Sequence, residues 1–227
     1  CGAYAINPQQ EHGTLSRAPV TTPQRLAAFV ERASNAPGIM KARRAAKHLL
    51  ANSRSPKETQ VAMQAVLPRL LGGFAAPAPV LNHEFNLPSE IASVVGQSKV
   101  CADLYWPDIQ TVLEYDSKDR HDSYGAVEHD ARKRTAYSLL GLDAIPITKG
   151  QFEDLAVVTS VFNDILKRHG KRLKPANERQ LNARAELHSF LLYGQRRPRR
   201  VLNVAPALFP QVPEDVTATI PWPPDKA

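Results

Sequence analysis

The chain has 227 residues, 43% of them hydrophobic, and carries a formal net charge of +7 at pH 7. This length and composition predict one folded domain with appendages, and the basic charge favours polyanionic partners such as nucleic acid. The two cysteines, Cys1 and Cys101, are isolated from each other and indicate neither a disulfide framework nor a zinc site. No segment resembles a membrane span or a signal peptide, so we expect a cytoplasmic protein without a membrane partner.

Residues 1–54 predict a helical N-terminal extension. Thr21 or Thr22 can cap a helix over about 23–34 that has Pro23 in its first turn. After the break at "NAPG", a second helix is expected over 39–53, and its apolar stripe leaves a basic face that consists of Lys41, Arg43, Arg44 and Lys47. Because the chain begins with Cys1, we expect it to be a fragment with a further domain upstream.

The segment "SPKETQVAMQAVLPRLLGG" predicts a helix of roughly four turns. Ser55 is its expected N-cap, Pro56 its first residue, and Glu58 completes a capping box three residues after the cap. Pro68 is expected to bend the last turn, and the two following glycines are expected to end the helix.

Three strands, a helix, a strand and a long helix are expected next. The predicted strands lie in "PVLNHEFNLPS", "SVVGQSKVCADLYW" and "TVLEYD", and the turn "WPDIQ" joins the last two as a hairpin. Residues 126–140 predict a helix that ends at Gly141, "LDAIPIT" predicts a buried strand, and residues 149–170 predict one long amphipathic helix. This order predicts an α/β fold with a central mixed sheet flanked by helices.

The C-terminal part of the sequence is basic and then rich in proline. Residues 167–200 hold three Lys and eight Arg against two Glu, so residues 171–200 are expected to be a basic helical segment. Residues 201–227 contain six prolines and no apolar period, which predicts an extended or disordered tail. The folded core would then occupy residues 55–170.

Three carboxylates are expected to converge on one side of the predicted sheet. Glu114 and Asp116 are two apart on a strand and therefore share a face, and the hairpin turn brings Asp103 beside them. Carboxylates held together repel one another unless a hard cation neutralises them, and Mg²⁺ is the usual cation when the substrate supplies phosphate oxygens. The alternative is the polar, solvated face of a half-buried strand.

The segment "ADLYWPDIQTVLEYDSKDRHDSYGAVEHDARKRTAYSLLGLDAIPITKGQF" resembles the very-short-patch-repair-type endonucleases and their relatives of unknown function, in the PD-(D/E)xK nuclease superfamily. The family pattern has an aspartate before a Trp-Pro turn, a strand reading E-x-D-G, a nearby His, a helix with D-x-x-R, and a glycine before a short strand. The matching positions are Asp103, Trp106, Pro107, Glu114, Asp116, His121, Asp130, Arg134 and Gly141. The resemblance covers about residues 55–168 and implies a restriction-endonuclease-like core.

The resemblance also implies roles for these residues in a nuclease that uses Mg²⁺ or Mn²⁺ and acts on DNA, with RNA as the alternative substrate. Asp103 and Glu114 would ligate the metal with the carbonyl of Tyr115, and Asp116 would complete the site or hold a metal-bound water. His121 would transfer a proton, and Glu58 would contribute to the metal shell. The residues expected to contact the nucleic acid are Lys118, Arg134, Lys167, Arg168, Lys171 and Arg172.

The chain departs from the family pattern at two positions. Ser117 replaces the glycine of the strand motif, and Asp116 stands where the wider superfamily has a lysine that positions the attacking water.

Several of these residues also have structural explanations without a catalytic role. The capping box explains Glu58, and a surface ion pair explains Asp130 and Arg134. The other basic residues are explained by solvation. The second hypothesis is therefore that the chain has this fold but no catalytic activity. It would then be a nucleic-acid-binding regulatory module of the toxin-antitoxin or abortive-infection type.

Overall fold

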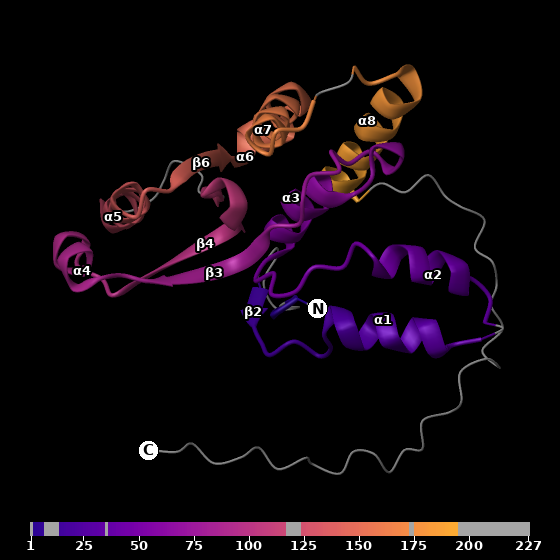
Figure 1. Cartoon of the computed structure of the whole chain (residues 1–227), viewed down its shortest axis with the longest axis horizontal. Helices are drawn as coiled ribbons and strands as arrows, with labels where there is room; N and C mark the ends of the chain where they lie inside the picture. The colour runs from indigo at the N-terminus through magenta and orange to yellow at the C-terminus, as the bar shows by residue number, and fades with distance from the viewer. Residues whose placement is uncertain (1, 7–13, 35, 117–123, 173–174, 195–227) are drawn as a thin grey trace, which may run out of the picture. The chain divides into compact units, whose positions relative to one another are not determined.

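The computed structural model describes residues 2–6, 14–34, 36–116, 124–172 and 175–194 (Figure 1). The helices are α1 (Pro23–Arg32), α2 (Ile39–Ala46), α3 (Pro56–Val66), α4 (Ser89–Val95), α5 (Tyr124–Leu139), α6 (Lys149–Glu153), α7 (Leu155–Arg168) and α8 (Glu178–Tyr193). The strands are β1 (Tyr4–Ile6), β2 (Thr14–Ser16), β3 (Val80–Asn86), β4 (Lys99–Trp106), β5 (Thr111–Asp116) and β6 (Asp143–Thr148), and the 3₁₀ turns are η1 (Arg69–Leu71) and η2 (Pro107–Ile109).

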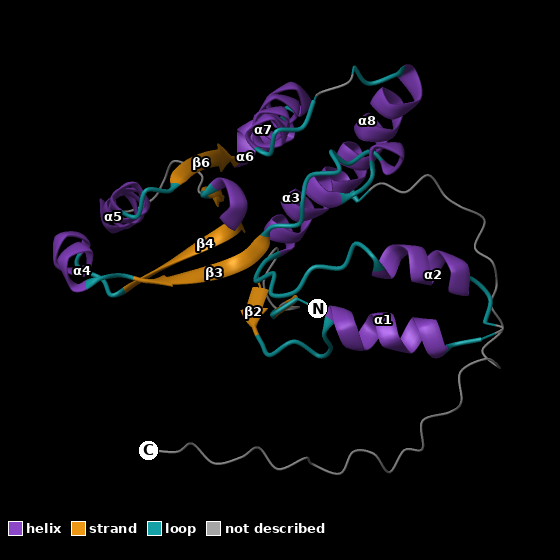
Figure 2. Ribbon diagram, viewed as in Figure 1, coloured by secondary structure: helices purple, strands orange, loops and turns teal. Residues whose placement is uncertain are grey.

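A four-stranded mixed sheet with the strand order β3-β4-β5-β6 forms the centre of the described residues (Figure 2). The pairs β3-β4 and β4-β5 are antiparallel, whereas β5 and β6 are parallel, with α5 between them in sequence. A parallel pair requires a long crossover, and the helix supplies it. The prediction of an α/β fold with a mixed sheet flanked by helices is confirmed.

Helices cover both faces of this sheet. Val112 and Leu113 are successive residues of β5, so their side chains point to opposite faces. Leu113 belongs to a buried cluster with residues of α3 and α7, and Val112 belongs to a second cluster with residues of α4 and α5. Both side chains are fully buried. The second cluster places α5 against the face from which the predicted carboxylates project.

Helix α3 begins as expected but ends earlier. Ser55 caps it, since its hydroxyl oxygen accepts a hydrogen bond from the Glu58 N–H at 3.1 Å. The prediction that the glycines end the helix is wrong, because Leu67 is extended at ψ 145° and proline disfavours the helical conformation of the residue before it. Gly72 has another role: a Cβ at this position would lie 2.3 Å from the backbone oxygen of Ala183, so the glycine lets α8 pack closely.

Three other elements differ from the sequence prediction. The start of the expected second strand is helix α4, and the strand itself begins at Lys99. The expected long helix over 149–170 is two helices, because the Asp154 carboxylate caps α7 by accepting the N–H of Ala156 at 2.8 Å. The prediction that residues 142–148 form a buried strand is wrong in its burial, because β6 lies at the sheet edge and Ile147 is its only buried residue. An edge strand also tolerates Pro146.

The predicted basic face of the second helix is used in part for internal contacts. Helix α2 ends at Ala46, before the expected boundary. The Arg43 guanidinium donates hydrogen bonds to the backbone oxygens of Val30 at 3.0 Å and of Glu31 and Ala33 at 2.9 Å each. These carbonyls belong to the end of α1, where the helix has no partners of its own for them. Arg43 therefore joins the two helices instead of extending into solvent.

Helix α8 lies in the predicted basic segment, but one of its arginines is buried. The Arg184 side chain packs over the Phe74 ring at 4.1 Å, and the residue is only 6% exposed. Burial and the neighbouring Arg69 lower the pKa of Arg184, and its Nε has no hydrogen-bond partner among the described residues. A buried cation of this kind is costly to keep.

We therefore expect Arg184→Met to leave the free energy of unfolding within about 1 kcal/mol of the wild type, or to increase it, because a buried charge is removed while ring contact is kept. Denaturant titration of the two proteins measures this difference. The control is Arg179→Met, an exposed residue of the same helix, which should change stability by less than about 0.5 kcal/mol. A loss above about 2 kcal/mol for Arg184→Met would show that the guanidinium has a strong stabilising partner.

Candidate active site

The hairpin of β4 and β5 brings Asp103 and Glu114 together. The strands are joined by the turn η2, and their register pairs Leu104 with Leu113. Asp103 and Glu114 are the residues that follow this pair on the side away from the turn. The Asp103 carboxylate accepts a hydrogen bond from the backbone N–H of Tyr115 at 2.8 Å. This contact holds one oxygen of Asp103 against β5. The two carboxylates therefore lie on the same face of the sheet, as the sequence predicts.

The electrostatics of Asp103 reflect its surroundings. Burial is the largest effect and, with the negative charge of Glu114, raises the pKa of Asp103 to about 7. The Lys133 ammonium and the Tyr115 N–H act in the opposite direction. Burial and the Glu114 charge therefore favour the protonated form of Asp103 over its carboxylate, and a bound cation would act against both effects.

Two residues of α5 hold Glu114, and the sequence reasoning missed both. The Lys133 ammonium forms an ion pair with Glu114 Oε2, and the Tyr137 hydroxyl donates a hydrogen bond to Glu114 Oε1 at 2.7 Å. Burial, together with the charge of Glu114 and this hydrogen bond, raises the pKa of Tyr137. The signal in the sequence is the spacing: residues four apart on a helix share a face, and Lys133 also stands three residues after Asp130, where the family pattern has its arginine.

Glu58 adds negative charge from the other side of Asp103. It is only 8% exposed, and its Oε2 accepts hydrogen bonds from the Arg54 N–H at 2.8 Å and from Asn82 Nδ2 at 2.5 Å. Asn82 lies between two paired residues of β3, at the level of Asp103 on β4, and adopts φ +51°. The Glu58 charge contributes to raising the pKa of Asp103. The expected capping box is incomplete, because this carboxylate binds the Arg54 N–H instead of the N–H of the cap residue.

A cavity of about 440 Å³ is lined by the Asp103 and Glu114 carboxylates. Its lining residues come from β4, β5, α5, β6 and α6: Asp103, Glu114, Tyr115, Asp116, Asp130, Lys133, Arg134, Tyr137, Ala144, Pro146, Thr148 and Gln151. The Arg134 side chain is exposed and its Nε donates to the backbone oxygen of Asp130 at 3.3 Å. Acidic and basic side chains thus line one cavity, and Asp116, Asp130 and Arg134 belong to it.

The other predicted basic residues are placed in different ways. Lys167, Lys171 and Arg172 are exposed at the end of α7 and just after it. Arg168 is engaged by acidic groups, since it forms ion pairs with Asp143 and, at 2.7 Å, with Asp164. Lys118 and His121 lie outside the described residues, and their roles stay predictions.

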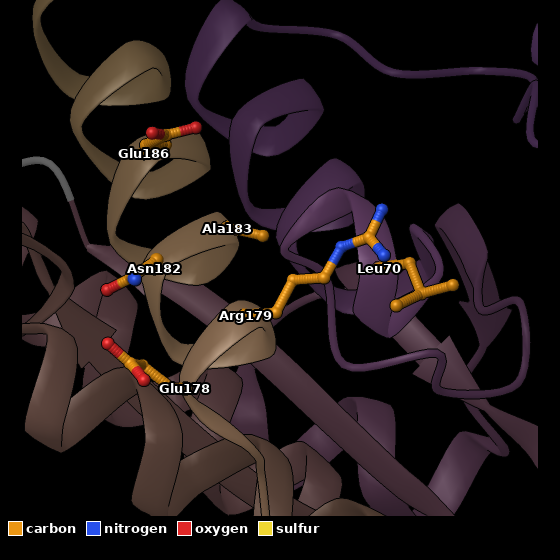
Figure 3. A pocket seen from close by; sticks show the side chains of 6 residues that line it. All are labelled: Leu70, Glu178, Arg179, Asn182, Ala183 and Glu186. Atoms are coloured by element: carbon orange, nitrogen blue, oxygen red, sulfur yellow. The ribbon is translucent and has the colours of Figure 1, made fainter.

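A second cavity, of about 480 Å³, lies between η1 and α8 (Figure 3). Arg179 extends from α8 toward Leu70, while Glu178, Asn182 and Glu186 follow the helix. None of the described carboxylates of the candidate active site lines this cavity. The concave surface relevant to the predicted chemistry is therefore the one beside Asp103 and Glu114.

Two of the predicted metal ligands, Asp103 and Glu114, have side chains that suit a divalent cation. Within the described ranges, no three His, Cys, Asp or Glu side chains are grouped as joint ligands of one ion. Asp103 and Glu114 nonetheless provide hard oxygen donors on adjacent strands, and both line the same cavity. The expected third donors, the Tyr115 carbonyl and Asp116, belong to residues that line the same cavity.

Comparison with known proteins finds no match for this chain. No protein-family model, no curated protein and no solved structure is significantly similar to it. The resemblance to the very-short-patch-repair-type endonucleases therefore stays a prediction based on the quoted residues. In the part of the chain that the structure describes, no helix is long and apolar enough to cross a membrane.

Proposed function

We propose that the chain is a metal-dependent endonuclease that hydrolyses DNA phosphodiester bonds in the cavity beside β5 and α5. The observation that carries this proposal is the pairing of Asp103 with Glu114 on adjacent strands, inside a cavity that also contains Lys133 and Arg134. Paired carboxylates suit a hard cation, and basic side chains next to them suit the phosphate of a nucleic acid. The order α3, β3, α4, β4, β5, α5, β6 supports a restriction-endonuclease-like core, in which α4 is inserted between the first two strands.

The residues have distinct roles in this proposal. Asp103 and Glu114 would hold Mg²⁺ or Mn²⁺ with the Tyr115 carbonyl, and Tyr137 would keep Glu114 oriented through its hydrogen bond. When bound, the ion would supply positive charge to the attacked phosphate and lower the pKa of a water. Asp116 would orient that water from the rim of the cavity, and Arg134 would contact the phosphate backbone. Glu58 would maintain the negative field, and His121 would transfer a proton.

A second function, the inactive nucleic-acid-binding module, is favoured by one observation. The Lys133 ammonium already neutralises Glu114, and a protein cation in this place can replace the metal in holding the carboxylates together. In that case the basic residues would still bind nucleic acid, and the cavity would have no catalytic use.

Incubation of the protein with supercoiled plasmid and with labelled single-stranded DNA and RNA tests the proposal. We expect nicked or linear plasmid with Mg²⁺ or Mn²⁺ and intact plasmid when the ion is chelated by EDTA, because the paired carboxylates act through the ion. Binding of the same DNA, measured by fluorescence anisotropy, separates the two functions. Binding without cutting under every metal condition would contradict the nuclease and support the regulatory module, and cutting of RNA alone would correct the substrate.

A further inference from the structure

The contact between Lys133 and Glu114 is unusual for a site that is to bind a cation. Their charged atoms form a direct ion pair, and the two side chains are only 20% and 17% exposed. Ion pairs on the protein surface are weak because water screens them, but this pair is shielded from most of the solvent. The ammonium therefore neutralises the carboxylate from the side of the cavity.

An ammonium and a divalent cation cannot both occupy the oxygen of Glu114 without strong repulsion. Like charges a few ångströms apart in a partly buried site repel strongly, because little water lies between them to screen the interaction. Glu114 Oε1 is held separately by Tyr137, so Oε2 is the oxygen for which Lys133 and a metal would compete. Binding of the ion thus requires the ammonium to leave.

The structure offers a place for the displaced ammonium. Lys133 lines the cavity of the carboxylates and also a neighbouring cavity of about 290 Å³, which is formed with Glu84, Gln97, Lys99, Val100, Cys101 and His129. The Glu84 carboxylate that lines this neighbouring cavity is exposed and pairs with Arg54 at 3.0 Å and with Lys99 at 4.0 Å, and the Lys133 ammonium would join these cations around it. Tyr137 can retain Glu114 meanwhile, since its hydroxyl donates to Glu114 Oε1 at 2.7 Å. The backbone oxygen of Cys101, 2.9 Å from the same hydroxyl, is an alternative acceptor for its single proton.

We propose that Lys133 competes with the divalent ion for Glu114: it holds the carboxylate while no metal is bound and moves to the neighbouring cavity when metal binds. Lys133 thereby weakens metal affinity and keeps the carboxylates from repelling one another in the absence of the ion. This inference rests on the proposed metal site, but it concerns binding of the ion and does not require that the protein cleave nucleic acid.

Isothermal titration of the protein with MnCl₂, without nucleic acid, tests this competition. We expect Lys133→Met to lower the dissociation constant for Mn²⁺ by about tenfold or more, because the repelling charge is gone. The matched control is Arg132→Met, the adjacent residue on α5, which is exposed and paired with Glu128. It should change the constant by less than about twofold, since water screens its charge. Glu114→Gln should remove the tight binding in both the wild-type and the Lys133→Met backgrounds.

A second variant and a second readout guard against a folding defect. Lys133→Gln keeps a polar side chain, and the rise in melting temperature caused by MnCl₂ should be larger in either Lys133 variant than in the wild type. An unchanged or weaker affinity in both variants would overturn the inference. Tighter Mn²⁺ binding without any nuclease activity would support the competition and contradict the proposed function instead.

Discussion

Replacement of Glu114 by glutamine is expected to lower metal-dependent cleavage by on the order of 10²- to 10³-fold, the usual loss when one electrostatic partner of a transition state is removed. The amide has the shape of the carboxylate, so it can still accept the hydrogen bond of Tyr137, but it carries no charge for the ion. Single-turnover cleavage of labelled DNA at saturating Mg²⁺ measures the effect. Substrate binding should be nearly unchanged.

The matched control for this variant is Glu90→Gln. Glu90 is an exposed carboxylate in the first turn of α4, and it does not line the cavity of the candidate active site. Its replacement should leave the cleavage rate within about twofold, because water screens the charge of an exposed side chain. Undiminished cutting by Glu114→Gln would instead assign the activity to another centre or to a contaminant.

Asp103 is expected to make the metal-free protein less stable as the pH rises from about 4 to about 7. The folded protein keeps the Asp103 proton up to a pKa of about 7, whereas the unfolded chain releases it near 3.8. Between these values the folded state binds more protons, so the free energy of unfolding falls by up to about 1.4 kcal/mol per pH unit. The contribution of the Asp103 proton to stability is fully present below pH 3.8 and is lost above a pH of about 7.

Asp103→Asn isolates this effect because the amide cannot ionise. At pH 8 and without metal we expect the variant to be more stable than the wild type by about 2 to 4 kcal/mol, and at pH 4 the difference should nearly vanish. Urea unfolding at a series of pH values measures both. Glu186→Gln, an exposed carboxylate of α8, is the control and should show little dependence on pH. A constant difference between Asp103→Asn and the wild type at all pH values would show that ionisation of Asp103 costs the fold nothing.

Both predictions concern residues that the sequence identified, and the reason is local. Apolar runs with a period of two predict strands, and a short turn between two strands brings residues near it into register. The capping groups of α1 and α3, Thr22 and Ser55, were likewise visible, because a cap acts on the N–H groups two or three residues further on. These interactions span few residues, so the sequence order is sufficient to predict them.

Errors arose where two local signals competed. Pro68 ended α3 before the glycines could, and Asp154 acted as a cap inside a stretch whose apolar period continued through it. The sequence of helix α4 predicts the start of a strand, since short apolar runs fit either structure and packing against α5 decides between them. In each case the sequence indicated a secondary-structure element. Its bounds or its type depended on an adjacent residue of the chain or on the helix packed against it.

The sequence by itself determined the mixed α/β arrangement and the proximity of Asp103 and Glu114, because period, turns and caps act over a few residues. Only the tertiary structure decided which groups surround these carboxylates. Lys133 and Tyr137 reach Glu114 from α5, and Glu58 acts on Asp103 from α3, through contacts between residues far apart in the chain. Burial in that assembly shifts the pKa of Asp103, and desolvation is a property of the packed molecule that no segment has alone.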